Sequence, residues 1–242
     1  MKNPAPQIKI FIDFDGTITT EDVGEKIFLE TVPPEIVQPI LDDIVHKRID
    51  GRQGWKLLFD AAPGLSVLKI LEIANGIDID AGFKDFLEFC TNGKLPAIII
   101  SDGFEEYIKP ILAKHTLSHL TVLANRLQVS PEGKLQPMFP YTDEECRLCA
   151  NCKRNHLVSR SSDDDITVYI GNGSSDTCPA EYADYVFAKD ALLKHCEKER
   201  ISYFRYRNFR DVILRLTELI DKKKLKKLHR AVSLRKQLYK LG

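Results

Sequence analysis

Short runs of apolar residues, each closed by polar or turn-forming positions, recur along the chain. Four of these runs have the length of a strand and are apolar almost throughout, which is typical of strands covered on both faces of a sheet. We therefore predict four buried strands, at residues 8–14, 96–101, 166–171 and 185–188.

Other stretches repeat their apolar residues at helical spacing. We predict helices over residues 83–90 and 104–114, and four or so short helices between residues 21 and 79, where prolines and glycines interrupt the pattern. In residues 120–138, two strand-like segments flank a Ser-Pro-Glu-Gly turn. That arrangement predicts a β-hairpin.

Strands that alternate with helices predict an α/β fold with a parallel, doubly wound, Rossmann-like sheet. The all-helical block after the first strand is predicted to be an inserted cap. We expect a catalytic core at residues 1–20 and 81–242, with the hairpin near 120–138 and a basic C-terminal helix at 209–242, and a helical cap at 21–80.

Composition indicates the class of protein. The 242 residues are 43% hydrophobic and 29% charged, which is typical of a soluble globular chain with a sizeable core. No run approaches the roughly 20 apolar residues that span a bilayer. The first apolar run also lacks the pattern of a secretory signal. We therefore expect a cytoplasmic protein.

Charge is balanced overall but unevenly distributed. Residues 222–242 hold nine Lys or Arg and no acid, which leaves residues 1–221 with 26 basic and 35 acidic residues, a net charge of −9. Interleaved apolar residues make this tail an amphipathic basic helix, and Tyr239 is its only aromatic residue. We expect its apolar stripe to pack on the core or on a second copy, in a monomer or homodimer, rather than to bind nucleic acid or membrane.

Polar residues follow three of the predicted strands. Asp13 and Asp15 end the first, Ser101 ends the second, and Asn172 and Asp176 follow the third. In open α/β sheets, ligands bind outside the carboxyl ends of the strands. We therefore expect these residues to face one crevice.

Their chemistry suits phosphoryl transfer. Two close carboxylates repel each other, and a hard cation such as Mg²⁺, which takes oxygen ligands, relieves that repulsion. A carboxylate can also attack phosphorus and form an aspartyl-phosphate. We expect Gly16 and Thr17 to offer open backbone N–H groups to phosphate oxygens, and Ser101 to offer a hydroxyl beside a helix N-terminus.

Four segments in order resemble the motifs of the haloacid dehalogenase superfamily: Phe11-Ile-Asp-Phe-Asp-Gly-Thr-Ile-Thr, Ile98-Ile-Ile-Ser, Lys153 and Gly171-Asn-Gly-Ser-Ser-Asp. The helical block between the first two is similar to the cap of the phosphoserine phosphatase-like branch. Within that branch, the chain looks most like two groups. One is the methionine-salvage phosphatase acting on a methylthio-pentenyl phosphate, and the other comprises the phosphocholine, phosphoethanolamine and pyridoxal phosphate phosphatases.

The resemblance implies a Mg²⁺-dependent phosphomonoesterase that hydrolyses a small soluble phosphorylated metabolite through an aspartyl-phosphate. Asp13 would be the nucleophile and Asp15 the general acid/base. The implied phosphate-binding residues are Gly16, Thr17, Ser101, Asp102, Gly103 and Lys153. The implied Mg²⁺ ligands are Asp13, Asp15, Asn172 and Asp176.

One position departs from the family pattern. The fourth motif usually begins Gly-Asp, and here Asn172 stands in the place of that Asp. Its amide oxygen can ligate Mg²⁺ but lacks the charge of a carboxylate. Two alternatives therefore stay open: a phosphotransferase that uses the same intermediate, and a non-catalytic protein that binds a phosphorylated ligand.

Two further features each have two interpretations. Asp22 is either the substrate-facing acid of the cap, as in phosphoserine phosphatases, or the start of a helix whose dipole favours it. Cys146, Cys149 and Cys152 have the spacing of metal ligands and allow a structural Zn²⁺. The alternative is that this cysteine loop shapes the substrate pocket beside Lys153.

Overall fold

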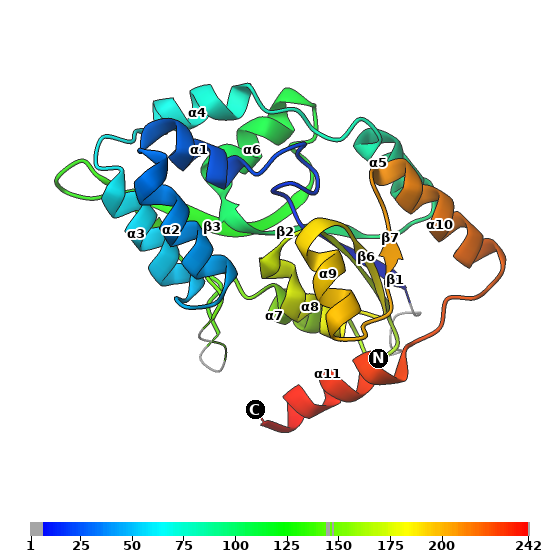
Figure 1. Ribbon diagram of the computed structural model, residues 1–242. Helices are drawn as coiled ribbons and strands as arrows, with labels where there is room; N and C mark the ends of the chain where they lie inside the picture. Colours follow the sequence, from blue (N-terminus) through cyan, green and yellow to red (C-terminus); the bar gives the residue numbers. More distant parts are fainter. Residues whose placement is uncertain (1–6, 144–145, 147, 242) are drawn as a thin grey trace. The chain divides into compact units, whose positions relative to one another are not determined.

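The computed structural model describes residues 7–143, 146 and 148–241 (Figure 1). The strands of these residues form a seven-stranded sheet with the order β4-β3-β2-β1-β5-β6-β7. They are β1 (Ile8–Ile12), β2 (Ala97–Phe104), β3 (Thr121–Val129), β4 (Leu135–Met138), β5 (Ile166–Gly171), β6 (Tyr185–Ala188) and β7 (Phe204–Arg205).

Parallel pairing joins β1 to both β2 and β5, β5 to β6, and β6 to β7, whereas β3 and β4 form an antiparallel hairpin. The helices are α1 (Val23–Thr31), α2 (Pro34–Val45), α3 (Gly51–Ala61), α4 (Val67–Asn75), α5 (Phe83–Asn92), α6 (Glu105–Lys114), α7 (Lys153–Ser159), α8 (Thr177–Tyr182), α9 (Asp190–Lys198), α10 (Phe209–Asp221) and α11 (His229–Leu241). This arrangement confirms the predicted α/β fold, the four buried strands and the hairpin. Four helices occupy the block predicted as a cap.

The chain divides into two compact units, which are described separately. The first unit comprises Met1–Asp13, Ile79–Ile99 and Lys153–Gly242, and the second comprises Phe14–Asp78 and Ile100–Cys152. Strand β2 contributes residues to both units because the boundary falls between Ile99 and Ile100.

The first unit is built on parallel strands that are covered on both faces. In β1, Ile10 and Ile12 are fully buried and pair with Val168 and Ile170 of β5, and Phe11 between them, which points to the opposite face, is fully buried as well. Figure 1 shows α5 and α10 side by side on one side of these strands, with α7, α8 and α9 on the other. Helices α5 and α10 meet through aromatic rings, with the Phe83 and Phe209 centroids 4.9 Å apart. Burial on both faces explains why these strands are continuous apolar runs.

The second unit packs helices α1 to α4 with α6 and the β3–β4 hairpin. Its interior holds an aromatic cluster that comprises the buried Phe28, Phe59 and Phe104 and the half-buried Trp55. Trp55 and Phe59 each meet Phe104 edge to face, with centroid distances of 4.9 and 5.4 Å. Such pairs add to the stability gained from burial alone.

The C-terminal segment differs from the single helix predicted at residues 209–242. Helix α10 ends at Asp221 and α11 begins at His229, so residues 222–228 interrupt the helix. Five lysines fall within this interruption, and like charges on neighbouring helical positions destabilise a helix. Its backbone is tied instead to β6, where the Tyr185 hydroxyl accepts a hydrogen bond from the Lys226 N–H at 2.8 Å.

Helix α11 is fastened to the rest of the first unit by a buried ion pair. The Arg235 guanidinium, in a residue only 5% exposed, donates to both carboxylate oxygens of Asp184 at 3.1 Å and to the Thr167 hydroxyl at 2.9 Å. The same carboxylate accepts the backbone N–H groups of Thr167 and Leu228. Within the part of the chain that the structure describes, no helix has the length and apolar character needed to cross a membrane.

Candidate active site

In the first unit, a buried lysine joins two predicted acids. Lys153 begins α7 and is 1% exposed, and its Nζ donates to Asp13 Oδ1 at 2.5 Å and to Asp176 Oδ1 at 2.7 Å. A third bond, at 2.9 Å, goes to the Ser175 hydroxyl. Asp13 follows directly on β1, and its N–H donates to the Ile170 carbonyl of the neighbouring β5. The predicted Asp13, Lys153 and Asp176 therefore lie together, and with Ser175 they form the lysine cluster.

Asp176 is held by a dense set of donors. Its Oδ1 accepts the Tyr169 hydroxyl at 2.6 Å as well as Lys153, and its Oδ2 accepts the backbone N–H groups of Asn172 and Gly173, both at 2.9 Å. The turn Ser174–Asp176 after β5 folds the carboxylate back onto its own loop. Four donors around the buried carboxylate fix its orientation.

The lysine cluster is charged. Burial opposes the charge of Lys153, but the carboxylates of Asp13 and Asp176 more than offset it and hold the pKa of Lys153 well above its ordinary value. Burial also raises the pKa of Tyr169, and the carboxylates of Asp176 and Asp13 raise it further. One cation with two carboxylates therefore stands where β1 and β5 end, and its net negative charge favours binding of a further cation.

In the second unit, Asp15 is surrounded by hydroxyl groups. Its Oδ2 accepts the Ser101 hydroxyl at 3.1 Å and the Tyr107 hydroxyl at 2.9 Å. Its Oδ1 accepts the N–H of Val23 at 3.3 Å, and Ser101 in turn accepts the N–H of Gly103 at 2.9 Å. Burial raises the pKa of Tyr107 well above its ordinary value, as do the carboxylates of Asp15 and Asp22. We call Asp15, Ser101, Gly103 and Tyr107 the hydroxyl cluster.

The turn after Asp15 differs from the sequence-based expectation. Gly16 has φ +68°, which glycine adopts without strain, and its N–H donates to the Thr19 hydroxyl at 3.0 Å and to the Glu21 carbonyl at 3.2 Å. The Thr17 N–H donates to the Phe14 carbonyl, and Thr17 is fully buried. Both N–H groups therefore close the turn, which corrects the expectation that they stand open to phosphate.

Asp102, predicted to bind phosphate, organises the neighbouring backbone. Its carboxylate accepts the Asn151 N–H at 2.9 Å and the Trp55 indole N–H at 3.3 Å, and its carbonyl accepts the Asn125 side chain at 2.7 Å. Asn151 also bonds the Ser101 carbonyl at 2.7 Å. A carboxylate repels phosphate, and the phosphate-binding role of Asp102 stays a prediction.

Asp22 is the N-cap of α1. Its side chain accepts the Glu25 N–H at 2.8 Å. This contact agrees with the interpretation of Asp22 as the start of a helix. Burial and the neighbouring Asp22 carboxylate raise the pKa of Glu25. A direct role of Asp22 toward a substrate stays a prediction.

In the described part of the cysteine loop, the structure does not show the zinc site that the spacing allows. Among the described residues, no group of three or more His, Cys, Asp or Glu side chains is placed to hold a metal ion. The Cys146 thiol contacts the Cys149 sulfur at 3.8 Å, whereas Cys152 contacts Asp143 Oδ2 at 3.7 Å. Zinc ligands spaced as C-x-x-C-x-x-C need a fourth ligand and convergent sulfurs, which the pattern alone does not secure.

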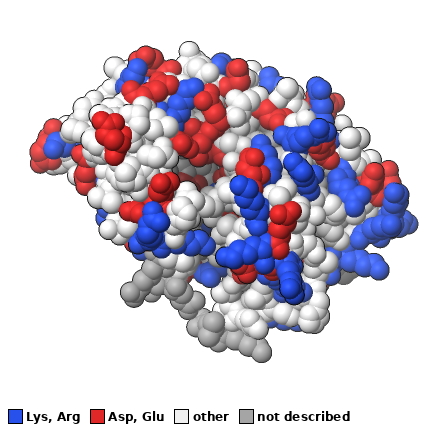
Figure 2. Space-filling view, viewed as in Figure 1, with Lys and Arg blue, Asp and Glu red and all other residues white. Residues whose placement is uncertain are grey.

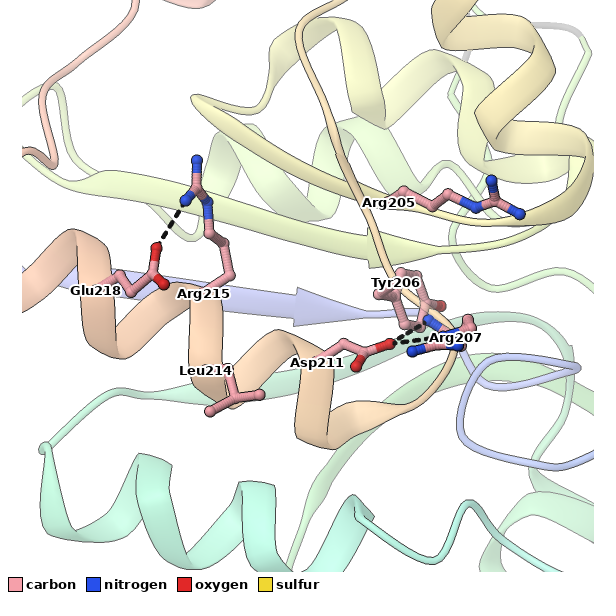
Figure 3. Close-up of a pocket in the computed structure, with 7 residues that line it drawn as sticks. All are labelled: Arg205, Tyr206, Arg207, Asp211, Leu214, Arg215 and Glu218. Carbon is pink, nitrogen blue, oxygen red and sulfur yellow. Dashed lines mark hydrogen bonds and ion pairs between the residues drawn. The ribbon is translucent and has the colours of Figure 1, made fainter.

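A cavity of about 600 Å³ lies along α10 and is lined by Arg205, Tyr206, Arg207, Asp211, Leu214, Arg215 and Glu218 (Figure 3). Ion pairs link Arg207 with Asp211 and Arg215 with Glu218. Figure 2 shows Lys and Arg side chains gathered where α10 and the segment after it lie. None of the predicted site residues lines this cavity, so we assign the chemistry to the strand ends instead.

Sequence reasoning did not single out Tyr107, Tyr169, Ser175 or Asn151. Ser175 lies inside the fourth motif and could have been found there. The two tyrosines reach their carboxylates through the fold, from helix α6 and strand β5, and no local pattern marks them.

Comparison with known families shows which family the chain belongs to. Residues 8–197 match the family model described as Putative Phosphatase. The chain belongs to this family. It is a phosphatase of the haloacid dehalogenase type, as the four motifs indicated.

Two relatives of this phosphatase show how similar the sequences are. A 2-hydroxy-3-keto-5-methylthiopentenyl-1-phosphate phosphatase of Bacillus mycoides (strain KBAB4) is 31% identical over 219 residues, which cover 89% of this chain and 99% of the relative. The protein of the same name from Bacillus cereus (strain ATCC 14579) is 29% identical over the same coverage.

Solved phosphoserine phosphatase structures share the fold of this phosphatase. A phospho-aspartyl intermediate analogue superimposes with a TM-score of 0.67 at 22% identity, and a substrate-bound complex with 0.66 at 20%. Each comparison covers 87% of this chain and 98% of the solved chain. The similarity confirms the α/β architecture predicted from the pattern of strands and helices.

Proposed function

We propose that this phosphatase hydrolyses small phosphate monoesters in a Mg²⁺-dependent reaction that passes through an aspartyl-phosphate on Asp13. The observation that carries the proposal is the buried lysine cluster, in which Lys153 joins the carboxylates of Asp13 and Asp176. A cation held against a carboxylate keeps that carboxylate ionised and oriented, which a nucleophile requires.

The two clusters supply complementary groups. Asp13 attacks phosphorus while Lys153 neutralises charge on the transferring oxygens, since phosphoryl transfer depends mainly on positioning and electrostatic stabilisation. Asp15 donates a proton to the leaving oxygen and later accepts one from the attacking water. Asp13 and Asp15 are two residues apart in the chain, so their Cα atoms lie within about 7.6 Å of each other.

The available donors fit Mg²⁺. Asp13 offers a carboxylate oxygen, Asn172 an amide oxygen and Asp15 a backbone carbonyl, and such hard oxygen ligands are those that Mg²⁺ prefers. Asp176 already accepts four hydrogen bonds, so we give it the role of orienting Lys153 and the Asn172 backbone from behind. When bound, the metal supplies charge neutralisation for the transferred phosphoryl group.

For the substrate, we propose a phosphate ester with an apolar portion. The relatives named methylthiopentenyl-phosphate phosphatases cover nearly the whole chain. In the second unit, the half-buried Trp55 is joined to Asp102, the residue after Ser101, and packs on Phe104. Thioether groups make favourable contacts with aromatic rings, which suits a substrate that carries a methylthio group.

The test is phosphate release from a panel of esters, with and without Mg²⁺, by the unmodified chain and by Asp13→Asn. The panel comprises 2-hydroxy-3-keto-5-methylthiopentenyl-1-phosphate, phosphoserine, phosphocholine, phosphoethanolamine and pyridoxal phosphate. We expect Mg²⁺-dependent release with the first ester preferred, a covalent phosphate that mass spectrometry locates on Asp13, and no turnover by the variant.

Two results would contradict the proposal. Transfer of phosphate to an added alcohol in place of release would identify a phosphotransferase. Binding of the esters without turnover at saturating Mg²⁺ would identify a binding protein, and Asn172→Asp would then show whether the missing carboxylate is the cause.

A further inference from the structure

Tyr107 is buried against the carboxylate to which we assign the leaving-group proton. We propose that Tyr107 is a positioning residue, which holds the Asp15 carboxyl in the orientation required to protonate the leaving oxygen. The inference rests on the proposed function, because it concerns the second carboxylate of that reaction.

Hydrogen-bond donors reach both oxygens of the Asp15 carboxyl. Oδ2 accepts two hydroxyl donors, from Tyr107 at 2.9 Å and from Ser101 at 3.1 Å. The other oxygen, Oδ1, accepts the Val23 N–H at 3.3 Å, so donors hold the carboxyl group at both oxygens and fix its rotation. Ser101 is itself oriented by the Gly103 N–H at 2.9 Å. Tyr107 therefore helps to fix the direction in which the Asp15 carboxyl faces.

The phenol has a fixed position. Tyr107 is 1% exposed, and its ring lies 6.5 Å from that of Phe14 and 6.4 Å from that of Phe104, measured between centroids. Close packing on both neighbours restricts rotation of the ring. The hydroxyl is thus held at Asp15 before any substrate arrives, which is what effective proton transfer requires.

Gly103 provides the space that this contact needs. A Cβ at position 103 would lie 1.6 Å from the Tyr107 hydroxyl oxygen and 2.6 Å from Asp15 Oδ2. Any side chain at this position would drive the phenol away from the carboxylate. The glycine after Asp102 therefore has a steric role toward Tyr107, in addition to the phosphate-binding role that the motif implies.

The leaving group of the substrate distinguishes positioning from a merely structural hydrogen bond. Esters of alkyl alcohols need a proton on the departing oxygen, whereas p-nitrophenolate departs without one. For Tyr107→Phe, we expect kcat/KM to fall at least tenfold for the best alkyl ester of the panel and less than threefold for p-nitrophenyl phosphate. This parameter covers the steps up to phosphoryl transfer, so later hydrolysis of the aspartyl-phosphate does not enter.

Two variants accompany the test. Gly103→Ala displaces the phenol instead of removing it and should show the same dependence on the leaving group. Tyr203→Phe removes a hydroxyl that donates to the exposed Glu197 and should leave both esters unchanged. Turnover of both esters by the unmodified chain establishes the proposed function beforehand. An equal loss for the two esters in Tyr107→Phe, or no loss, would then overturn the role of Tyr107 alone.

Discussion

The two carboxylates of the first motif have opposite surroundings, although they stand two positions apart in the sequence. In the first unit, Asp13 meets the ammonium group of Lys153, whereas in the second unit Asp15 meets the hydroxyls of Ser101 and Tyr107. The ammonium group brings a full positive charge to Asp13, whereas the hydroxyls bring only neutral hydrogen-bond donors to Asp15. This difference matches the two roles that we propose, nucleophilic attack by Asp13 and proton transfer by Asp15.

The largest expected effect distinguishes Asp13 from Asp15 by whether the variant still carries out the first step of the reaction. Asp13→Asn should lower kcat at least a thousandfold on every ester, because no nucleophile remains. Asp15→Asn should still release a burst of p-nitrophenol from p-nitrophenyl phosphate, since the first step with that ester needs no acid. Rapid-mixing kinetics measure the burst. If Asp13→Asn kept a tenth of the original activity, Asp13 could not be the nucleophile and the contrast with Asp15 would be wrong.

The charges of the lysine cluster should affect the free energy of unfolding. Lys153→Met leaves the Asp13 and Asp176 carboxylates buried without their cation, and we expect the free energy of unfolding to fall by about 3–5 kcal/mol. Ser101→Ala, its counterpart in the hydroxyl cluster, removes one hydroxyl donor but no cation and should cost about 1 kcal/mol. Urea unfolding followed by circular dichroism compares them, and equal losses would contradict the contrast drawn between the clusters.

Acid should weaken the protein through a buried histidine on the same helix as Lys153. Burial, with Arg160 nearby, lowers the pKa of His156 to about 4, below the value of about 6.5 in an unfolded chain. Between these values the unfolded chain binds the extra proton, so stability falls as the pH falls, by about 2 kcal/mol from pH 7.5 to pH 5. His156→Gln should flatten this dependence in urea titrations at the two pH values. Parallel losses in both proteins would exclude His156 as the source.

The smallest expected effect lies in the second unit. Trp55→Phe keeps an aromatic ring beside Phe104 but removes the indole bond to Asp102, which should cost about 1 kcal/mol of stability. We expect a rise of a fewfold in KM and an unchanged kcat, since the ring lies beside the substrate in our proposal. Steady-state kinetics on the preferred ester decide this, and a fall in kcat alone would place Trp55 in the chemical step instead.

Much of the fold follows from the sequence because it depends on local pattern. The buried strands were predictable as continuous apolar runs, since burial on both faces leaves no polar alternation. The hairpin followed from its turn residues. The interruption at residues 222–228 was not predicted, because leucine spacing continues across it while the lysine charges and the contact with Tyr185 end the helix.

The candidate site was predictable where chemistry resides in motifs. Lys153 contacts Asp13 from 140 positions away, as the order of the motifs implies. The hydrogen bonds of individual groups could not be predicted from the sequence pattern. The amides of Gly16 and Thr17 close their own turn, and Asp102 accepts an indole and a backbone N–H. Tyr107 could not be found, since only the folded chain brings its phenol to a carboxylate 92 positions away, and Tyr169, seven positions from Asp176, was hidden in an apolar strand.

The anchorage of α11 has a consequence for how the chain can be shortened. Arg235 is the guanidinium partner of Asp184, a carboxylate only 1% exposed, and Asp184 also binds the backbone at the start of β5 through Thr167. A chain ended within the exposed lysines after α10 would lose that partner and leave an uncompensated negative charge beneath the strand that leads to the fourth motif. The basic C-terminal segment therefore stabilises the strands that carry the candidate site. Removing it would destabilise the enzyme at a point remote from that site.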